Sequence, residues 1–278
     1  MKKFIHSACL CVCISMNAQL QTPESSPAAT LMQTVGLTDF TVKFSRPSAR
    51  GRKVIGNLVS FDHKWRTGAN DNTTIQFTDS VKIEGQPLAA GTYALFTQPG
   101  EQEWEIYFYT DTDNSRVPKK WKLDKVAATV KVTPKPTGKL ETFSIWFSDL
   151  TYNDAHLNLA WENTKISMKV EVPTDAKTMA SIKQVMNNDP KERDYYEAAV
   201  YYLQTGRDLK QAKEWVNKAV SMNDNTYWYF RQQALILAGL NEMEAAIEAA
   251  KKSLVRAEKA GNLDYVKLNT DSIADWSK

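Results

Sequence analysis

The sequence has few of the residues and motifs on which most enzyme chemistry depends. Its three cysteines, Cys9, Cys11 and Cys13, all lie close to the N-terminus. Removal of that segment leaves no cysteine, which excludes disulfides and thiolate metal sites from the rest of the chain. The chain has only three histidines and contains no Gly-x-Ser-x-Gly turn, phosphate-binding loop or His-Glu-x-x-His motif. We therefore expect no metal and no cofactor.

A large charge excess and a long apolar run are also missing. The formal net charge of +3 falls to +1 (3 − 2) once Lys2 and Lys3 are removed. Such a small balance argues against nucleic acid as a partner, because phosphate-binding proteins usually carry a clear basic excess. The apolar run after Lys3, FIHSACLCVCISM, is too short to span a bilayer. We therefore expect no transmembrane anchor in the mature chain.

The N-terminal segment has the features of a secretory signal peptide. Two lysines precede the short apolar run, and Ala18 provides a small residue at its boundary. We predict a signal peptide over residues 1–18, cleavage after Ala18, and a periplasmic or secreted protein. The alternative is lipidation of Cys13, which is disfavoured because the bulky Val12 directly precedes that cysteine.

The segment from Val35 to about Val172 has the two-residue period of β-strands. Strand-like stretches such as FTVKFS, TTIQFT and EWEIYFY are rich in aromatic and β-branched residues, and turn residues separate them. We expect HLNLAWENTKISMKVEV to form two strands joined around Asn163-Thr164. Eight to ten strands without a helical stretch predict an antiparallel β-sandwich or flattened barrel with one solvated face.

The apolar residues that alternate with polar neighbours are the predicted core. They are Phe40, Val42, Phe44, Ile75, Phe77, Tyr93, Leu95, Trp104, Ile106, Phe108, Phe143, Ile145, Phe147, Leu157, Leu159 and Trp161.

Beyond Pro173 the period becomes helical, and the chain repeats itself at an interval of 34 residues. Ala, Glu, Lys and Leu dominate this part. The matched pairs are Tyr196 and Phe230, Val200 and Ala234, Leu203 and Leu237, Ala212 and Ala246, Val216 and Ala250, and Ala219 and Ser253. This period, with small residues where helices cross, is typical of tetratricopeptide helix pairs. We expect a terminal cap using Val266, Thr270, Ile273 and Trp276.

These patterns divide the chain into five parts. A signal peptide (1–18) precedes an N-terminal extension (19–34), a β domain (35–172), a linker (173–178) and a tetratricopeptide-like helical domain (179–278).

The Arg- and Gly-rich stretch from Ser45 to Thr74 contains the candidate ligand-binding residues. Arg offers fixed fork donors, Trp offers a stacking surface, and Gly lets the backbone approach closely. The alternative, that these residues only fix the conformation of their own loop, is the simpler interpretation. The candidates are Arg46, Arg52, Trp65, Arg66, Asn70 and Asp71.

Other polar residues suggest weaker alternatives. Asp62, His63 or Asp71 could serve a hydrolase or carbohydrate-active enzyme as acid or base, although a loop histidine is the simpler interpretation. His156 has the same simpler interpretation. TDTDNS resembles the start of a calcium loop but lacks its Gly and terminal Glu, so we expect an exposed connection. In the helical part, the candidate groove residues for a peptide or protein partner are Tyr195, Tyr202, Trp228 and Arg231.

Several long motifs resemble the secreted bacterial domain-of-unknown-function family 2911. They include QTVGLTDFTVKFSRPSARGRKVIGNLV, WRTGAND and LAAGTYALFTQPGEQEWEIYF, and the likeness runs from about Ser26 to Val172. The resemblance implies an exported β-rich domain without established activity, sometimes followed by tetratricopeptide-like helices. Members of that family usually have Glu where this chain has Asp71, a difference that a charge-pairing role would tolerate better than a catalytic one.

Taken together, the patterns favour an exported, non-enzymatic binding or scaffold protein. The β domain would hold a small molecule, glycan or other envelope component, and the helical repeats would bind a peptide or protein. The hydrolase described above is the alternative.

Overall fold

The computed structural model describes residues 22–278, and this part of the chain forms two compact units with their boundary between Pro173 and Thr174. The first unit consists of antiparallel sheets and the second of helices. The predicted succession of a β domain and an α domain is therefore confirmed. The predicted signal peptide (1–18) and Cys13 lie outside the described residues.

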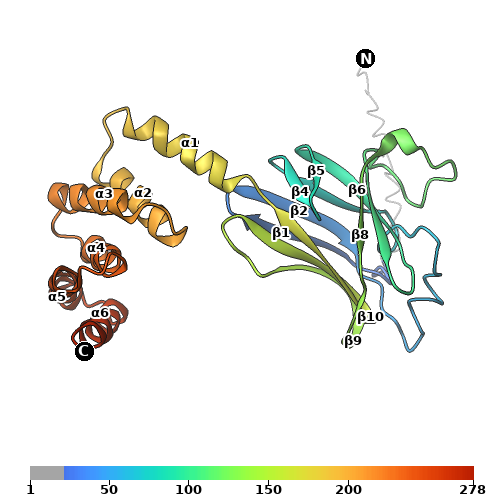
Figure 1. Ribbon diagram of the computed structural model, residues 1–278. Helices are drawn as coiled ribbons and strands as arrows, with labels where there is room; N and C mark the ends of the chain where they lie inside the picture. The colour runs from blue at the N-terminus through green and yellow to red at the C-terminus, as the bar shows by residue number, and fades with distance from the viewer. Residues whose placement is uncertain (1–21) are drawn as a thin grey trace, which may run out of the picture. The chain divides into compact units, whose positions relative to one another are not determined.

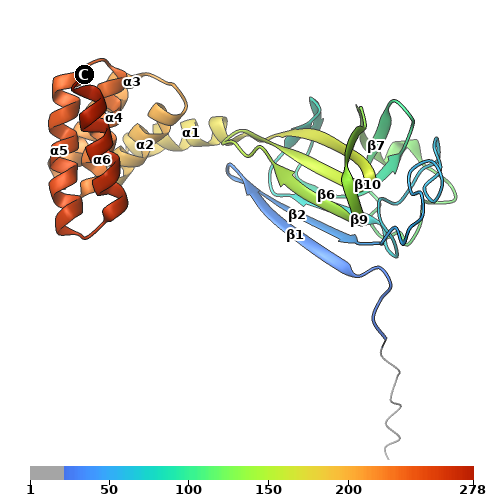
Figure 2. The same cartoon turned by 90° about the horizontal axis from the view of Figure 1, so that it is seen from below.

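Two antiparallel sheets make up the β unit (Figure 1). Along the first sheet the order is β1 (Ala28–Val35), β2 (Thr38–Ser45), β3 (Thr73–Phe77), β6 (Gly91–Gln98), β7 (Trp104–Tyr109) and β8 (Val126–Val132). Along the second sheet the order is β5 (Gln86–Leu88), β4 (Val81–Ile83), β10 (Asp154–Glu171) and β9 (Lys135–Ser148). The layers are visible in Figure 2, where β1 and β2 lie below β9 and β10.

The core lies between the two sheets and contains the residues expected from the two-residue period. In β2, for example, Phe40, Val42 and Phe44 are buried while Asp39 and Lys43 are exposed. Every predicted core residue is buried except Phe147, which is half-buried and packs against the others. Apolar side chains from both sheets therefore share one core, as in a sandwich.

Two predicted boundaries in the β unit differ from the structure. Residues 28–34, predicted as part of an extension, belong to β1, which pairs with β2 along its whole length. The segment predicted as two strands joined at Asn163-Thr164 is the single strand β10. The chain does not reverse at Asn163-Thr164, because the break in the strand pattern is a β-bulge and not a turn. Glu162 has a φ of 54°, and the register with β9 shifts on both sides of it.

The expectation of a wholly solvated outer face is wrong for β6 and β7. Ala94, Phe96, Tyr107 and Tyr109 form a second buried cluster on that face. Trp121, from the connection before β8, covers the cluster and stacks on Tyr109 at a centroid distance of 4.6 Å. The period-two pattern missed this layer because its cover comes from a loop without periodicity.

Six helices form the second unit. They are α1 (Thr174–Met186), α2 (Glu192–Gln204), α3 (Leu209–Met222), α4 (Tyr227–Gly239), α5 (Met243–Lys259) and α6 (Leu263–Trp276). The first helix starts inside the predicted linker (173–178). Asp208 caps α3 and Asn262 caps α6, each accepting backbone N–H bonds with its side chain.

Consecutive helices pack as pairs, α2 with α3 and α4 with α5. Small residues lie at the crossings: Ala212, Ala219, Ala246 and Ser253 are all fully buried. Of the predicted cap residues on α6, Ile273 and Trp276 pack against the α4–α5 core. Thr270 is exposed instead, and its place on the packed face is taken by the fully buried Asn269.

Candidate functional site

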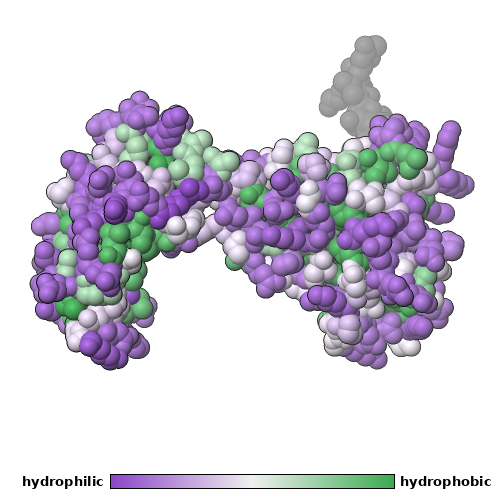
Figure 3. All heavy atoms as spheres, in the orientation of Figure 1, coloured by the Kyte–Doolittle hydropathy of each residue, from purple (hydrophilic) through white to green (hydrophobic). Residues whose placement is uncertain are grey.

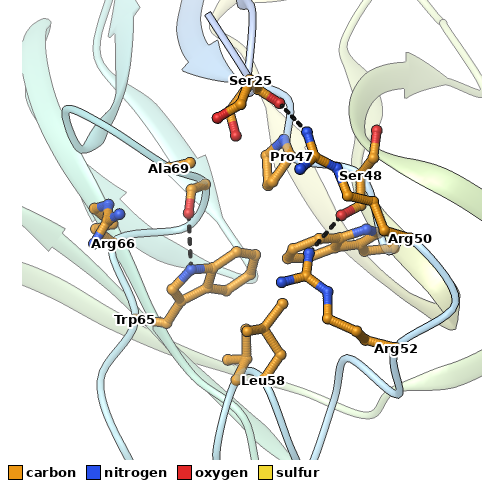
Figure 4. A pocket seen from close by; sticks show the side chains of 13 residues that line it. Ser25, Pro47, Ser48, Arg50, Arg52, Leu58, Trp65, Arg66 and Ala69 are labelled. Atoms are coloured by element: carbon orange, nitrogen blue, oxygen red, sulfur yellow. Dashed lines mark hydrogen bonds between the residues drawn. The ribbon is translucent and has the colours of Figure 1, made fainter.

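A cavity of about 340 Å³ opens at the connection between β2 and β3, residues 46–72 (Figure 4). Connections of this length between neighbouring antiparallel strands are unusual and often carry function. The lining residues are Ser25, Ser26, Pro47, Ser48, Arg50, Arg52, Leu58, Val59, Trp65, Arg66, Gly68, Ala69 and Trp161.

Trp65 forms one wall of this cavity, and several contacts fix its position. Its backbone exchanges two hydrogen bonds with Thr97 of β6, at 2.7 and 3.0 Å. The indole Nε1 donates to the Gly68 carbonyl at 3.0 Å. The ring stacks on Trp161 and meets Phe143 edge to face, at centroid distances of 5.8 and 5.2 Å. Because its N–H is already bonded, the half-buried indole offers a ligand its ring surface only.

The loop carries strained backbone directly beside Trp65. Thr67 has a φ of 59°, a conformation that β-branched residues rarely adopt. Its carbonyl accepts the Thr73 hydroxyl, and its own hydroxyl lies 3.2 Å from the Thr97 hydroxyl. These buried contacts hold the strained conformation. Such strain persists only where the surroundings determine it, and it concentrates at binding sites.

Arg52 is presented to the cavity in one fixed orientation. Its Nε donates to the Ala49 carbonyl and its Nη2 to the Ser48 carbonyl, both at 2.8 Å. Figure 4 shows the guanidinium group directed toward Trp65, above Leu58. The remaining N–H groups of the planar fork are free to bind a ligand in the cavity.

Arg50 lies on the same side of the cavity. Its Nη2 donates to the Ser25 carbonyl at 3.2 Å, and its backbone N–H donates to the Glu141 carboxylate at 2.6 Å. The Glu141 carboxylate therefore binds the backbone of Arg50 and does not line the cavity. Among the described residues that line this site, three are arginines and none is acidic, a composition that suits an anionic ligand.

The predicted ligand-binding residues have different positions. Trp65 and Arg52 line the cavity, and Arg66 lies at its margin, set apart from Arg50 and Arg52 in Figure 4. Arg46 does not line it: its Nε donates to the Phe143 carbonyl at 3.1 Å and its Nη2 to the Ser144 hydroxyl at 2.9 Å. The exposed Asn70 and Asp71 are also outside the lining.

Asn70 nevertheless helps to build one wall. Its side-chain amide donates to the Glu24 carboxylate at 3.0 Å and to the Ser26 carbonyl at 3.2 Å. These bonds hold the segment before β1, from which Ser25 and Ser26 contact the cavity.

The residues proposed as acid or base of a hydrolase, Asp62, His63 and Asp71, do not line this cavity. Asp62 and His63 are exposed, and the His63 Nδ1 lies 2.8 Å from the Phe61 carbonyl oxygen. His156 is in β10, 3.1 Å from the Asp149 carboxylate. Among residues 22–278, no group of three or more His, Cys, Asp or Glu side chains is arranged to hold a metal ion.

The TDTDNS segment fixes one loop to another. The Asn114 carbonyl accepts the Asn72 backbone N–H at 2.9 Å, and its own N–H donates to the Asn72 side chain at 3.0 Å. The segment therefore helps to hold the end of the 46–72 connection.

Of the residues that line the cavity, sequence reasoning named only Arg52, Trp65 and Arg66. It missed most of the lining, including Arg50, Ser48 and Trp161. Arg50 was detectable, since Arg-Gly-Arg places two guanidinium groups around one flexible residue. Trp161 was assigned to the core, where it does pack, but the cavity reaches one side of it.

The candidate partner residues of the helical unit contact different helices. Tyr202 meets Trp215 of α3 edge to face at 4.7 Å and lines a groove of about 500 Å³ with Met179 and Met186 of α1. Figure 3 shows apolar side chains on the visible face of α1.

Arg231 and Trp228 lie on α4, and Tyr195 is half-buried on α2. Trp228 is 40% exposed and meets Tyr227 edge to face. Arg231 is half-buried, and its Nη1 donates to the Ser272 hydroxyl of α6 at 2.9 Å. Burial lowers the pKa of Arg231 from its usual high value.

Comparison with known proteins supports the expected family. The family model described as "Protein of unknown function (DUF2911)" matches residues 26–170, which agrees with the predicted extent of the resemblance. No curated protein matches the chain. Within residues 22–278, no helix combines the length and the apolar character needed to cross a membrane.

Proposed function

We propose, from the premise that the chain belongs to the DUF2911 family of proteins of unknown function, that it is an exported, non-enzymatic binding protein. Its β unit holds a small anionic molecule, such as an acidic sugar, in the cavity between Arg50, Arg52 and Trp65. The single observation that carries this proposal is the cavity lining, in which the residues that the structure describes include three arginines and no carboxylate.

The fixed geometry of the site supports binding. Two backbone carbonyls orient Arg52, and three side-chain contacts orient the Trp65 indole, so little side-chain entropy is lost when a ligand enters. If the carboxylate of a ligand binds Arg50 and Arg52, the flat or apolar part of the same ligand lies against the Trp65 indole. Each charge-assisted hydrogen bond contributes about 1.5 to 3 kcal/mol.

A hydrolase needs a nucleophile or a general base within reach of the bound substrate. Asp62, His63 and Asp71 do not line the cavity, which favours binding over hydrolysis.

The test uses matched pairs of charged and neutral probes. Galacturonate and benzoate are compared with galactose and benzamide by thermal shift and then by isothermal titration calorimetry. We expect the anions to bind at least about tenfold more tightly, and Arg52→Gln to weaken their binding at least about tenfold. Lys82→Gln, an exposed change on β4, is the control. Equal affinity for anion and neutral probe, or unchanged binding by Arg52→Gln, would exclude this site.

We also propose that α2 to α5 are two tetratricopeptide-like repeats that bind an acidic peptide. The 34-residue period and the small residues at the helix crossings support the repeat assignment. Arg231 supports the acidic partner, because a half-buried cation that donates to the Ser272 hydroxyl gains from an added carboxylate.

A fluorescent glutamate-rich peptide and its glutamine counterpart test this second proposal by anisotropy. We expect only the acidic peptide to bind, and Arg231→Gln to reduce its affinity at least about fivefold. Lys267→Gln, an exposed change on α6, should leave the affinity unchanged. Similar binding of both peptides would contradict the proposal.

A further inference from the structure

The four outermost strands of the two sheets differ in how well their edges are protected. An exposed edge offers unpaired backbone N–H and C=O groups to another strand, and proteins normally block it with charge, proline, short length or a covering loop. In β5 the strand is three residues long and contains Pro87. In β8, Lys131 provides a charge and forms ion pairs with Glu103 and Glu105.

The 46–72 connection covers the middle of the β9 edge, around residues 141–143. Ala49 donates its backbone N–H to the Glu141 carbonyl at 2.7 Å, and Phe143 donates to the Pro47 carbonyl at 2.9 Å. The sequence of β9 also contains Pro136 and several charged residues.

Among residues 22–278, nothing gives the edge strand β1 any of these protections. Its sequence, AATLMQTV, contains no charged residue, proline or glycine. Within residues 22–278, its only strand partner is β2. Ala29 and Leu31 pack against the core, whereas Met32 on the outer face is 76% exposed. Figure 2 shows β1 at the free margin of its sheet.

We propose that β1 pairs antiparallel with β1 of a second copy, so that two β units share one continuous sheet. The two-fold axis of such a pair is perpendicular to the sheet, and residues of the same face must then oppose each other. A register centred on Met32 satisfies this condition and pairs residues 29–35 with the same segment of the second copy. Met32 then packs against its own equivalent.

The charges on the neighbouring strand fit this register. Thr30 pairs with Lys43 of β2, and Thr34 pairs with Asp39. In the proposed dimer Thr30 opposes Thr34 of the second copy, so Lys43 and the second copy's Asp39 lie in one row. Opposite charges therefore share each row, and no like charges meet. The other edges are protected, so association stops at two copies.

The contact is small, because one strand edge buries less surface than the interfaces of permanent dimers. We therefore expect a reversible dimer, detected by sedimentation velocity of the purified protein from low micromolar to submillimolar concentration. Met32→Lys should raise the dimer Kd about tenfold, because the substituted lysines of the two copies would face each other at the two-fold axis. Leu123→Lys, at a residue that is 81% exposed on the 3₁₀-helix Leu123–Lys125, is the matched control.

Cysteine cross-linking tests the register. Directly opposed strand residues have Cα atoms about 4.5 to 5.5 Å apart, within the range that a disulfide spans. In the chain without residues 1–18, Met32→Cys should give a disulfide-linked dimer in a glutathione buffer, and Thr30→Cys should not, since it lies opposite Thr34. A monomer at all concentrations, a dimer unaffected by Met32→Lys, or equal cross-linking by both cysteines would overturn the proposal.

Discussion

At the scale of single residues, the 46–72 connection depends on backbone conformations that few side chains permit. Gly56 has a φ of 82°, and a Cβ at this position would lie 2.5 Å from the Phe61 ring. Gly51 has a similar φ of 72°, but nothing lies within 4 Å of the corresponding point. Comparing the two glycines therefore separates the free-energy cost of a positive φ from the cost of the steric contact with Phe61.

We predict that Gly56→Ala destabilises the protein more than Gly51→Ala. A positive φ costs about 1 kcal/mol at either position, and the Phe61 contact adds about 1 to 3 kcal/mol at Gly56 only. Urea unfolding followed by tryptophan fluorescence measures the two differences. Equal destabilisation would mean that Phe61 moves aside at no cost.

The same scale shows why the site was only partly predictable. Arg46 and Arg52 are equivalent in the sequence, each an arginine in a polar loop. The Arg46 side chain is directed away from the cavity because it donates hydrogen bonds to the Phe143 carbonyl and the Ser144 hydroxyl. These two partners are nearly a hundred residues further along the chain. Arg52 instead donates a hydrogen bond to the carbonyl of Ala49, three residues earlier in the same turn. No local pattern encodes the approach of β9, so sequence reasoning could not separate the two.

At the scale of elements, prediction succeeded where the period of burial is local. The strands β2 and β3 and the helices after Pro173 follow from two- and 3.6-residue periods. Prediction failed where the conformation of one element depends on a contact with a distant one. The bulge in β10 occurs at Glu162, whose carboxylate accepts the Val54 backbone N–H at 2.7 Å from the distant loop.

The contact between α1 and α2 depends on a carboxylate and is therefore sensitive to pH. Asp175, in the first turn of α1, accepts hydrogen bonds from Arg207 and from the Tyr201 hydroxyl, the latter at 2.8 Å. The hydrogen bond from Arg207, followed by that from Tyr201, holds the pKa of Asp175 below its usual value. The stabilisation is therefore present above about pH 4, the usual aspartate pKa, and is lost as the pH falls through the lowered pKa.

We predict that the coupling between Asp175 and Arg207 disappears in acid. A double-mutant cycle with Asp175→Asn and Arg207→Gln, followed by helix unfolding at 222 nm, measures it. Because Asp175 is 46% exposed, solvent screening should keep the coupling at neutral pH small but measurable. It should approach zero below the lowered pKa. A coupling that is equal in neutral and acidic solution would show that the contact does not depend on ionised Asp175.

At the scale of the whole molecule, the proposed roles depend on export. A small-molecule site in the β unit and a peptide site in the helical unit suit a protein that meets envelope components, and the N-terminal sequence provides the expected route. Removal of residues 1–18 would also remove all three cysteines. The mature protein would then contain no thiol to oxidise outside the cytoplasm.

We predict that the protein isolated from the envelope or medium of an exporting bacterial host begins at Gln19. Intact-mass spectrometry and N-terminal sequencing measure this directly, and Ala18→Leu should block cleavage because the processing site requires a small residue. Lipidation at Cys13 would instead give a blocked N-terminus and a mass increased by acyl chains, and Cys13→Ala would release that form from the membrane. An unprocessed chain that retains Lys2 and stays in the cytoplasm would contradict export and, with it, the proposed access to envelope ligands.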